Sequence, residues 1–349
     1  MLLYASMFKK TAFRLVFILL LTAGLLYFFF RSVDWKEVFS YLTDVNLFFF
    51  IVFILLVPVN FLMRAFRWRY LLDHDKKNVS LYNRFAANVV GFTVTFIFPG
   101  RLGELIKPLY LARKENMGRG FVIGTVVVER IFDIFTMCFL LGVFFLAKPL
   151  YSSIFHIDAE SYSRLYLWGI IALSVSLILM LISLSLYFFR DKTVSVFSFF
   201  LRPFPKTFSE KIIKLLDEFI RGLKFFHSIK NLLLFFVWSV LVWLVIIFMY
   251  WILFFAYNIQ VAYFFLFPYV FLVIIGASIP TPGMVGGFHA FSRIGLVSLY
   301  GLDTNLAVGM TIVAHAVQLA VTCLMGYVIL WKEGISIFQI RKIGENNKK

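Results

Sequence analysis

Six apolar runs dominate this chain, and each is long enough to cross the hydrocarbon core of a membrane as a helix. The runs are residues 13–30, 47–67, 121–147, 165–189, 232–257 and 306–331. Hydrophobic residues make up 62% of the chain and charged residues only 15%, against about a half and about a quarter in soluble domains. The sequence therefore predicts an all-α polytopic membrane protein, with residues 1–349 forming a single membrane domain.

Two further apolar regions, residues 84–115 and 262–300, are interrupted by proline and glycine. The first break contains Pro99, Gly100 and Gly103, and the second contains Pro280, Pro282, Gly283, Gly286 and Gly287. An arm of about 15 residues reaches roughly 22 Å as a helix, which is short for a crossing. Irregular backbone occurs at membrane depth only where protein or a water-filled cavity covers it. We therefore predict two re-entrant hairpins.

The distribution of basic residues supports this topology. With two hairpins and a cytoplasmic N-terminus, 26 of the 34 Lys and Arg residues lie in inner segments. Those segments are residues 1–14, 64–84, 113–119, 190–230 and 332–349. Each half then has an odd number of crossings, so residues 13–147 and 148–331 form an inverted repeat. Both termini are expected on the cytoplasmic side of a bacterial-type cytoplasmic membrane.

The long inner loop, residues 203–230, has apolar residues at helical spacing and lysines and arginines largely elsewhere on the helical wheel. Such a helix is expected to lie on the inner leaflet and to contact anionic lipid; a solvated connector is the alternative. Residues 332–349 form a basic cytoplasmic tail. The net charge of +16 is assigned to the positive-inside bias, and no nucleic-acid partner is expected.

Six ionisable residues lie at the predicted membrane depth in the first half of the chain. They are Arg101, Glu104, Lys107, Glu129, Arg130 and Asp133. Charged side chains at this depth are costly and usually face a cavity. We favour a polar cavity that binds a lipid headgroup, and the alternative is a buried ion-pair network that braces the fold. If a helix starts after Pro99 and Gly100, its N-terminus and Arg101 favour phosphate.

The second half has fewer polar residues at the corresponding places. His289 and Arg293 follow the second break, and His315 and Gln318 lie in the last apolar run. These four are further candidate substrate-binding residues, and His315 is a candidate for titration near neutral pH. A hydrogen-bonded core histidine is the alternative for His315.

The sequence contains no signal for a bound metal ion, nucleotide or other cofactor. Cys138 and Cys323 both lie inside apolar runs, so no disulfide framework or metal site is expected. No phosphate-binding loop or dinucleotide fingerprint occurs, and no cofactor or catalytic residue is predicted.

Residues 99–113, which contain Pro-Gly-Arg-x-Gly-Glu, and residues 128–133, which contain Glu-Arg-x-x-Asp, resemble the transmembrane domain of the lysylphosphatidylglycerol synthase/flippase family. Residues 282–288 are similar to the second landmark of that family. The family commonly has an acidic residue at the position of His289 and an arginine at that of His315. In that family the membrane domain moves aminoacylated lipid between leaflets, so the resemblance implies a flippase-like protein. We expect this chain to be a stand-alone form without a synthase domain.

We expect a lipid translocase rather than an enzyme. Its partner would be an anionic or zwitterionic membrane lipid, bound by its polar or phosphate-bearing headgroup in the charged cavity. The alternative is a membrane-embedded transferase or accessory protein that acts on a lipid-linked substrate with a glycosyltransferase or another lipid-modifying enzyme.

Overall fold

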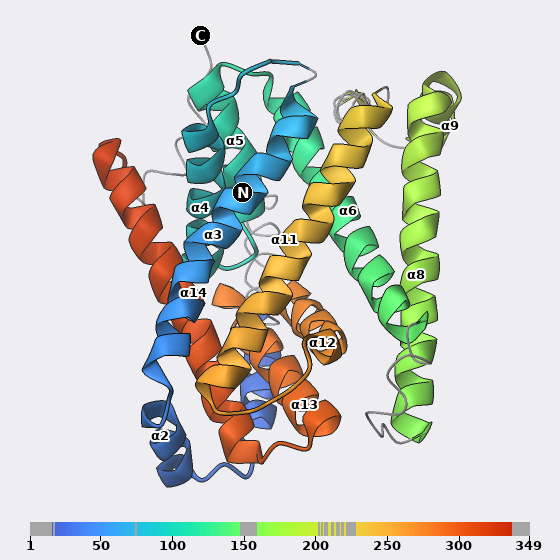
Figure 1. The fold of residues 1–349 in the computed structure, drawn as a ribbon. Helices are drawn as coiled ribbons and strands as arrows, with labels where there is room; N and C mark the ends of the chain where they lie inside the picture. The colour runs from blue at the N-terminus through green and yellow to red at the C-terminus, as the bar shows by residue number, and fades with distance from the viewer. Residues whose placement is uncertain are drawn as a thin grey trace. The chain divides into compact units, whose positions relative to one another are not determined.

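A computed structural model describes residues 16–146, 159–201 and 228–336, except residues 17 and 74, and scattered positions between 203 and 220. Within these residues all regular structure is helical, which confirms the predicted all-α class (Figure 1). The first helices are Ile18–Phe30, α2 (Trp35–Thr43), α3 (Leu47–Leu72), α4 (Leu81–Ile97), α5 (Gly103–Glu115) and α6 (Arg119–Leu146). They are followed by α8 (Ala159–Phe188), α9 (Arg190–Leu201), α11 (Ile229–Ala256), η2 (Tyr263–Phe265), α12 (Leu266–Ser278), η3 (Pro282–Met284), α13 (Gly287–Tyr300) and α14 (Thr304–Lys332).

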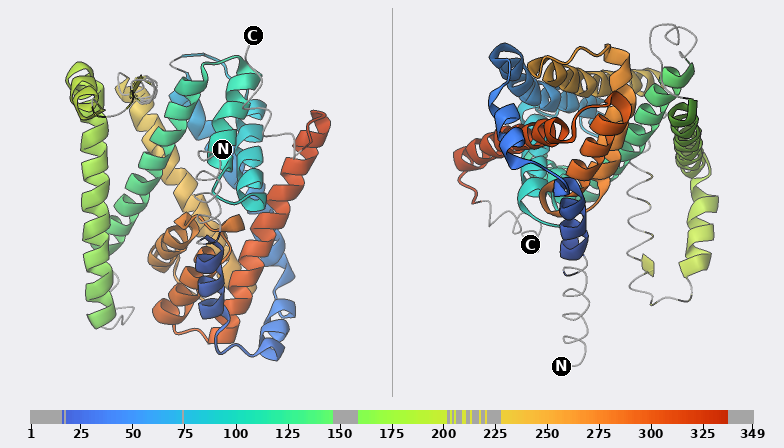
Figure 2. Two further views of the ribbon diagram at one scale, coloured as in Figure 1. Left: turned by 180° about the vertical axis from the view of Figure 1, so that it is seen from behind. Right: turned by 90° about the horizontal axis from the view of Figure 1, so that it is seen from below.

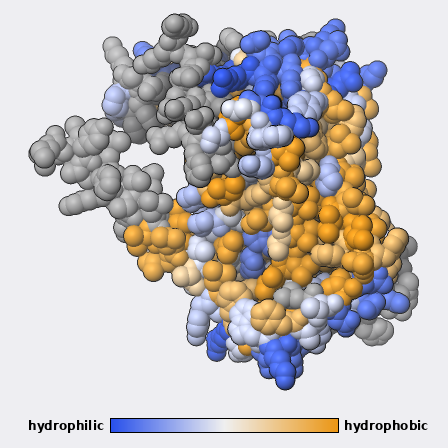
Figure 3. Space-filling model, turned by 90° about the vertical axis from the view of Figure 1, so that its left-hand side faces the viewer, coloured by the Kyte–Doolittle hydropathy of each residue, from blue (hydrophilic) through white to orange (hydrophobic). Residues whose placement is uncertain are grey.

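Within the described residues, three helices are both long and apolar enough to cross a membrane: α3, α11 and α14. The helix Ile18–Phe30 and α2 together would make a fourth span, although the chain bends by 84° between them (Figure 2). Hydrophobic residues also gather over a broad area of the face drawn in Figure 3. The chain is an integral membrane protein. The six spans, the inverted repeat and the side on which the termini lie stay predictions.

The chain divides into two compact units, each assembled from three separate segments. Unit 1 comprises Met1–Pro58, Gly91–Gly103 and Ile247–Val328. Unit 2 comprises Val59–Val90, Glu104–Ile246 and Ile329–Lys349. The second break belongs to unit 1, whereas most of the charged candidate residues of the first half belong to unit 2.

The first break separates α4 from α5. Gly100 and Arg101 both have left-handed backbone, with φ of 76° and 53°, so the chain reverses there. A Cβ on Gly103 would collide with the carbonyl oxygen of Gly91, which requires glycine where the two helices meet beside the break. At the far ends of the helices, Glu115 Oε1 accepts hydrogen bonds from the first turn of α4 and the residue before it. Residues 80–115 are therefore a closed helical hairpin.

The second break separates α12 from α13 and is built in the same way. A Cβ on Gly276 would collide with the carbonyl oxygen of Gly287, and a Cβ on Gly287 with that of Gly276. At the open ends of these helices, the Tyr300 hydroxyl donates to the carbonyl of Phe265 at 2.7 Å. The two Pro-Gly breaks were read from the sequence, but the glycine pairs that hold each hairpin together were not.

Two expectations from the sequence differ from the structure, and a third concerns segments that lie mostly outside the described residues. The predicted run 47–67 continues as α3 to Leu72, and the apolar side chains of this extension, Trp68, Leu71 and Leu72, are fully buried. Helix α5 begins at Gly103, so Arg101 precedes it. Most of the amphipathic loop 203–230 and most of the basic tail 332–349 lie outside the described residues.

Candidate functional site

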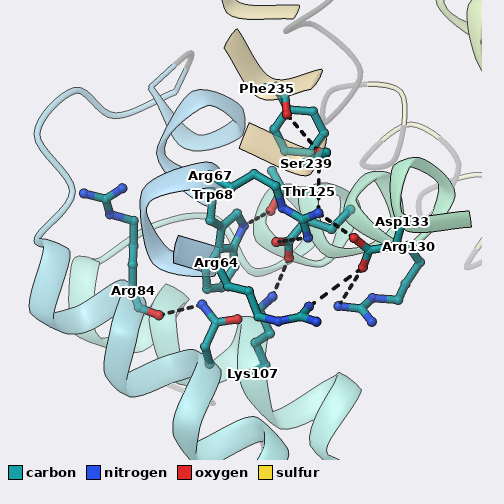
Figure 4. Close-up of polar contacts among 12 residues, drawn as sticks. Arg64, Arg67, Trp68, Arg84, Lys107, Thr125, Arg130, Asp133, Phe235 and Ser239 are labelled. Carbon is teal, nitrogen blue, oxygen red and sulfur yellow. Dashed lines mark hydrogen bonds and ion pairs between the residues drawn. The ribbon is translucent and has the colours of Figure 1, made fainter. Parts of the chain in front are cut away.

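Unit 2 contains a buried group of ionisable side chains that we call the charged cluster (Figure 4). Its members are Arg64, Arg67, Lys107, Glu129, Arg130 and Asp133. They come from three helices: α3 supplies two arginines, α5 the lysine and α6 the other three residues.

Helical spacing places these groups on facing surfaces. On α6, Glu129 and Asp133 are four residues apart and share a face. On α3, Arg64 and Arg67 are three residues apart and share the face that meets them. These side chains are therefore organised by ordinary helix geometry once α3 and α6 pack against each other.

The centre of the cluster is the guanidinium of Arg67, which is fully buried. It donates to Glu129 Oε1 at 3.1 Å and to Asp133 Oδ1, so it bridges the two carboxylates. The Lys107 ammonium donates to the second oxygen of Glu129. Each of these charges has an opposite partner, as buried charges require.

The edge of the cluster is more accessible. Asp133 Oδ2 lies 3.4 Å from Arg130 Nη2 and 4.0 Å from Arg64 Nη1. The Arg130 side chain is 33% exposed, whereas that of Arg64 is 8% exposed. Asn60 Oδ1 accepts from Arg64 Nε at 3.0 Å and orients this guanidinium. Two guanidiniums thus flank one carboxylate, and one of them, that of Arg130, is partly exposed.

Neighbouring side chains hold the inner members in place. The Lys107 ammonium lies 4.3 Å from the centre of the Trp68 ring, a cation–π contact. The Trp68 indole N–H in turn donates to the hydroxyl of Thr125 at 3.0 Å. Both partners of this N–H···O bond are fully buried, so Trp68 is fixed beside Lys107 by packing and by a hydrogen bond.

The cluster carries more positive than negative charge. Four of its members are cationic and two are carboxylates, so it has a formal surplus of two positive charges. This differs from the near balance expected from the sequence, which counted Arg101 and Glu104 and left out two arginines. An anionic group is therefore the electrostatically favoured guest.

Sequence reasoning counted Arg64 and Arg67 with the basic residues of the inner segment 64–84 and did not include them among the candidate site residues. The signal that could have found them is the spacing of Asn60, Arg64 and Arg67, which puts three polar side chains on one face of an apolar helix. Arg84, also counted in that loop, is buried and donates to the carbonyl of Ala65 at 2.7 Å.

The remaining basic candidates bind helix ends in unit 1. Arg101 donates to the carbonyl of Ala277, in the last turn of α12. Arg293 donates to the carbonyls of Phe28 and Phe29, at 2.7 and 2.6 Å, where the first helix ends. The last carbonyls of a helix lack intrahelical partners, so both arginines cap C-termini. Glu104 lies half-buried in the first turn of α5.

The polar candidates of the second half also lie in unit 1. The imidazoles of His289 and His315 meet edge to face, with ring centres 4.6 Å apart. Gln318 Nε2 donates to the hydroxyl of Tyr250 at 3.2 Å. Gly283 and Gly286 have φ of 60° and 93°, conformations that favour glycine. In the part of the chain that the structure describes, no group of three or more His, Cys, Asp or Glu residues has a metal-binding arrangement.

Comparison with known proteins gives two matches. Residues 13–326 match the family described as the lysylphosphatidylglycerol synthase TM region, which confirms the resemblance carried by the motifs. The chain is also 26% identical over 189 residues to the UPF0104 membrane protein MJ1595 of Methanocaldococcus jannaschii, covering 51% of this chain and 52% of that protein. The chain thus spans about half the length of the curated relative that it matches.

Proposed function

Because the chain belongs to the lysylphosphatidylglycerol synthase transmembrane-region family, we propose that it is a lipid translocase for lipids with a phosphate-bearing headgroup. The charged cluster would bind the headgroup while the acyl chains stay in the bilayer. The observation that carries the proposal is the cluster's surplus of positive charge inside an integral membrane protein.

The accessible edge of the cluster is suited to phosphate recognition. Arg64 and Arg130 present guanidiniums, whose planar N–H groups match phosphate oxygens. At present they share Asp133 Oδ2, at 4.0 and 3.4 Å, which is longer than a charge-assisted hydrogen bond. A phosphate would compete with this carboxylate for both arginines and would form shorter bonds.

The buried centre would serve a different purpose. Arg67 and Lys107 hold Glu129 between them, and all three are at most 4% exposed. A brace of this kind keeps the carboxylates in place when the phosphate arrives and leaves. The alternative role, in which the whole cluster only stabilises the fold, predicts that no single arginine affects lipid movement without affecting stability.

Reconstitution into vesicles tests the proposal. Fluorescent phosphatidylglycerol and a labelled polyprenyl phosphate should cross between leaflets faster than in empty vesicles, and a glycosyl-diacylglycerol without phosphate should not. Arg130→Gln should slow the phosphate lipids about tenfold, because a hydrogen bond to a charged group contributes about 1.5–3 kcal/mol.

The matched control is Arg69→Gln, which removes a different exposed arginine, in the last turn of α3, that pairs with Asp73 directly after this helix. Movement no faster than in empty vesicles would refute the translocase. Equal slowing of lipid movement by Arg69→Gln and Arg130→Gln would show that the charged cluster does not bind the moving lipid. A chemically new lipid in extracts of the vesicles would instead support the transferase alternative.

A further inference from the structure

The two histidines of unit 1 have no part in headgroup binding as proposed above. His289 lies in the first turn of α13, and His315 lies in the middle of α14. His315 Nδ1 is 3.3 Å from His289 Nε2, and His315 Nε2 is 3.0 Å from the carbonyl oxygen of Gly283. The three residues form a hydrogen-bonded chain that ends at the second Pro-Gly break.

These contacts admit one arrangement of protons for the neutral pair. A carbonyl oxygen only accepts, so His315 carries its proton on Nε2 and its Nδ1 is an acceptor. His289 must then donate to that acceptor from its own Nε2. As a result, His289 Nδ1 carries an unprotonated lone pair.

The Nδ1 atom of His289 is buried and lacks a hydrogen-bond partner among the described residues. The His289 residue as a whole is 8% exposed. Buried polar atoms are nearly always hydrogen-bonded, and exceptions often have a functional reason. Here the exception is a basic nitrogen at the open end of a hydrogen-bonded chain.

The surroundings of the two rings are apolar. Phe29 lies 5.0 Å from the His289 ring, and Phe288 and Phe96 lie 5.1 and 5.8 Å from the His315 ring, centre to centre. Of the ionisable groups on the neighbouring helices, Arg293 donates to helix-end carbonyls. Among the described residues, no carboxylate forms a hydrogen bond or an ion pair with either ring. A positive charge on the pair is therefore energetically costly unless an anion compensates for it.

We infer that His289 and His315 form a proton-binding site, in which the proton is the coupling ion for lipid movement. A proton binds at His289 Nδ1. The proton on His289 Nε2 passes to His315 Nδ1, which makes His315 an imidazolium whose Nε2–H still donates to the Gly283 carbonyl. One proton enters and one charge is gained, so the step needs no other reactant.

The role in transport rests on the proposed function, whereas the proton site rests on the histidine geometry alone. A lone imidazolium is costly here, so an anionic headgroup that neutralises its charge would raise the affinity for the proton, and by linkage the proton would raise the affinity for the headgroup by the same factor. The lipid and the proton would then cross in the same direction.

Nitrogen-15 NMR of histidine-labelled protein in lipid nanodiscs tests the site without any transport. At neutral pH both side chains should be neutral and protonated on Nε2, and His315→Gln should shift the His289 signals. A neutral His289 protonated on Nδ1 would overturn the inference, because its Nε2 could then not donate to His315 Nδ1.

A pH gradient tests the coupling. In vesicles with one unit of pH difference, labelled polyprenyl phosphate should accumulate about tenfold if one proton accompanies each lipid. His289→Gln and His315→Gln each keep an N–H donor near the position of Nε2 but cannot titrate. They should still equilibrate the lipid yet lose the accumulation, while Arg69→Gln keeps it.

Accumulation by His289→Gln equal to that of the unmodified protein would overturn the coupling. If the unmodified protein moves no lipid, the proposed function fails, and the NMR measurement still decides the proton site. The two failures are thus distinguishable.

Discussion

The close approach of α12 and α13 depends on Gly276, and Gly276→Ala should weaken it measurably. A Cβ at this position would lie 2.6 Å from Cβ of Phe291 and 3.0 Å from the carbonyl carbon of Gly287. Carbon atoms in good contact are about 3.5–4.0 Å apart, so α13 would have to move by about 1 Å. Part of the obstacle is backbone, which cannot turn aside as a flexible side chain can.

The expected cost follows from two opposing effects. Overpacking of this kind costs about 1–3 kcal/mol, and the rigid obstacle places this case near the upper end. Alanine is a better helix former than glycine by about 1 kcal/mol, which offsets part of the cost. We expect a net loss of about 2 kcal/mol in the free energy of unfolding, and a fall of the apparent melting temperature on the order of 5 °C.

Thermal unfolding in detergent, followed with a thiol-reactive dye that reports exposure of buried Cys138, measures this change. The control is Gly142→Ala in α6, where the new Cβ would meet its nearest atom, Leu173 Cδ2, at an ordinary 3.8 Å. That variant should be as stable as the unmodified protein or slightly more so. Equal melting temperatures for Gly276→Ala and Gly142→Ala would refute the close-packing argument.

Three further substitutions test the cluster and the polar ends of unit 2. Arg67→Met leaves two buried carboxylates without their shared cation and should cost about 3–5 kcal/mol in thermal unfolding; a loss below 1 kcal/mol would show that the cluster is less buried than described. Burial would raise the pKa of Glu115, but hydrogen bonds from Lys76 and from the start of α4 lower it below its usual value. Stability should therefore fall as the pH drops below about 4.5, the usual value for glutamate, and Glu115→Gln should flatten this dependence; an unchanged pH profile would contradict the assignment. Tyr110→Phe removes the hydroxyl that donates to Glu333 and should cost about 1–3 kcal/mol, whereas no change in melting would show that this bond is not maintained.

Local patterns in the sequence predicted the helices and the breaks well. The apolar run 306–331 lies within α14, and Pro99, Gly100, Pro282 and Gly283 lie between α-helices. These features depend on hydrophobicity and backbone freedom, which neighbouring residues determine. The role of Arg64 and Arg67 was harder to predict, because arginines at the end of an apolar run resemble the basic residues of an inner segment unless their distant partners are known.

The candidate site was predicted in part. Lys107, Glu129, Arg130 and Asp133 do meet in one cluster, as the helical spacing on α6 and the neighbouring hairpin suggested. Arg101, in contrast, binds the carbonyl of Ala277, 176 residues away along the chain. Helical spacing orders side chains within one helix, but it does not say which other helix they face.

Hydrophobicity and residue order are enough to identify this chain as a helical membrane protein with two Pro-Gly breaks and several charges inside apolar runs. How those charges pair becomes visible only in the folded protein. The Arg67 guanidinium lies between carboxylates 62 and 66 residues further along the chain. Such pairing, and the resulting surplus of positive charge, depends on the packing of α3 against α6. In an apolar interior each buried charge must find a partner, and tertiary packing decides which partners lie within reach.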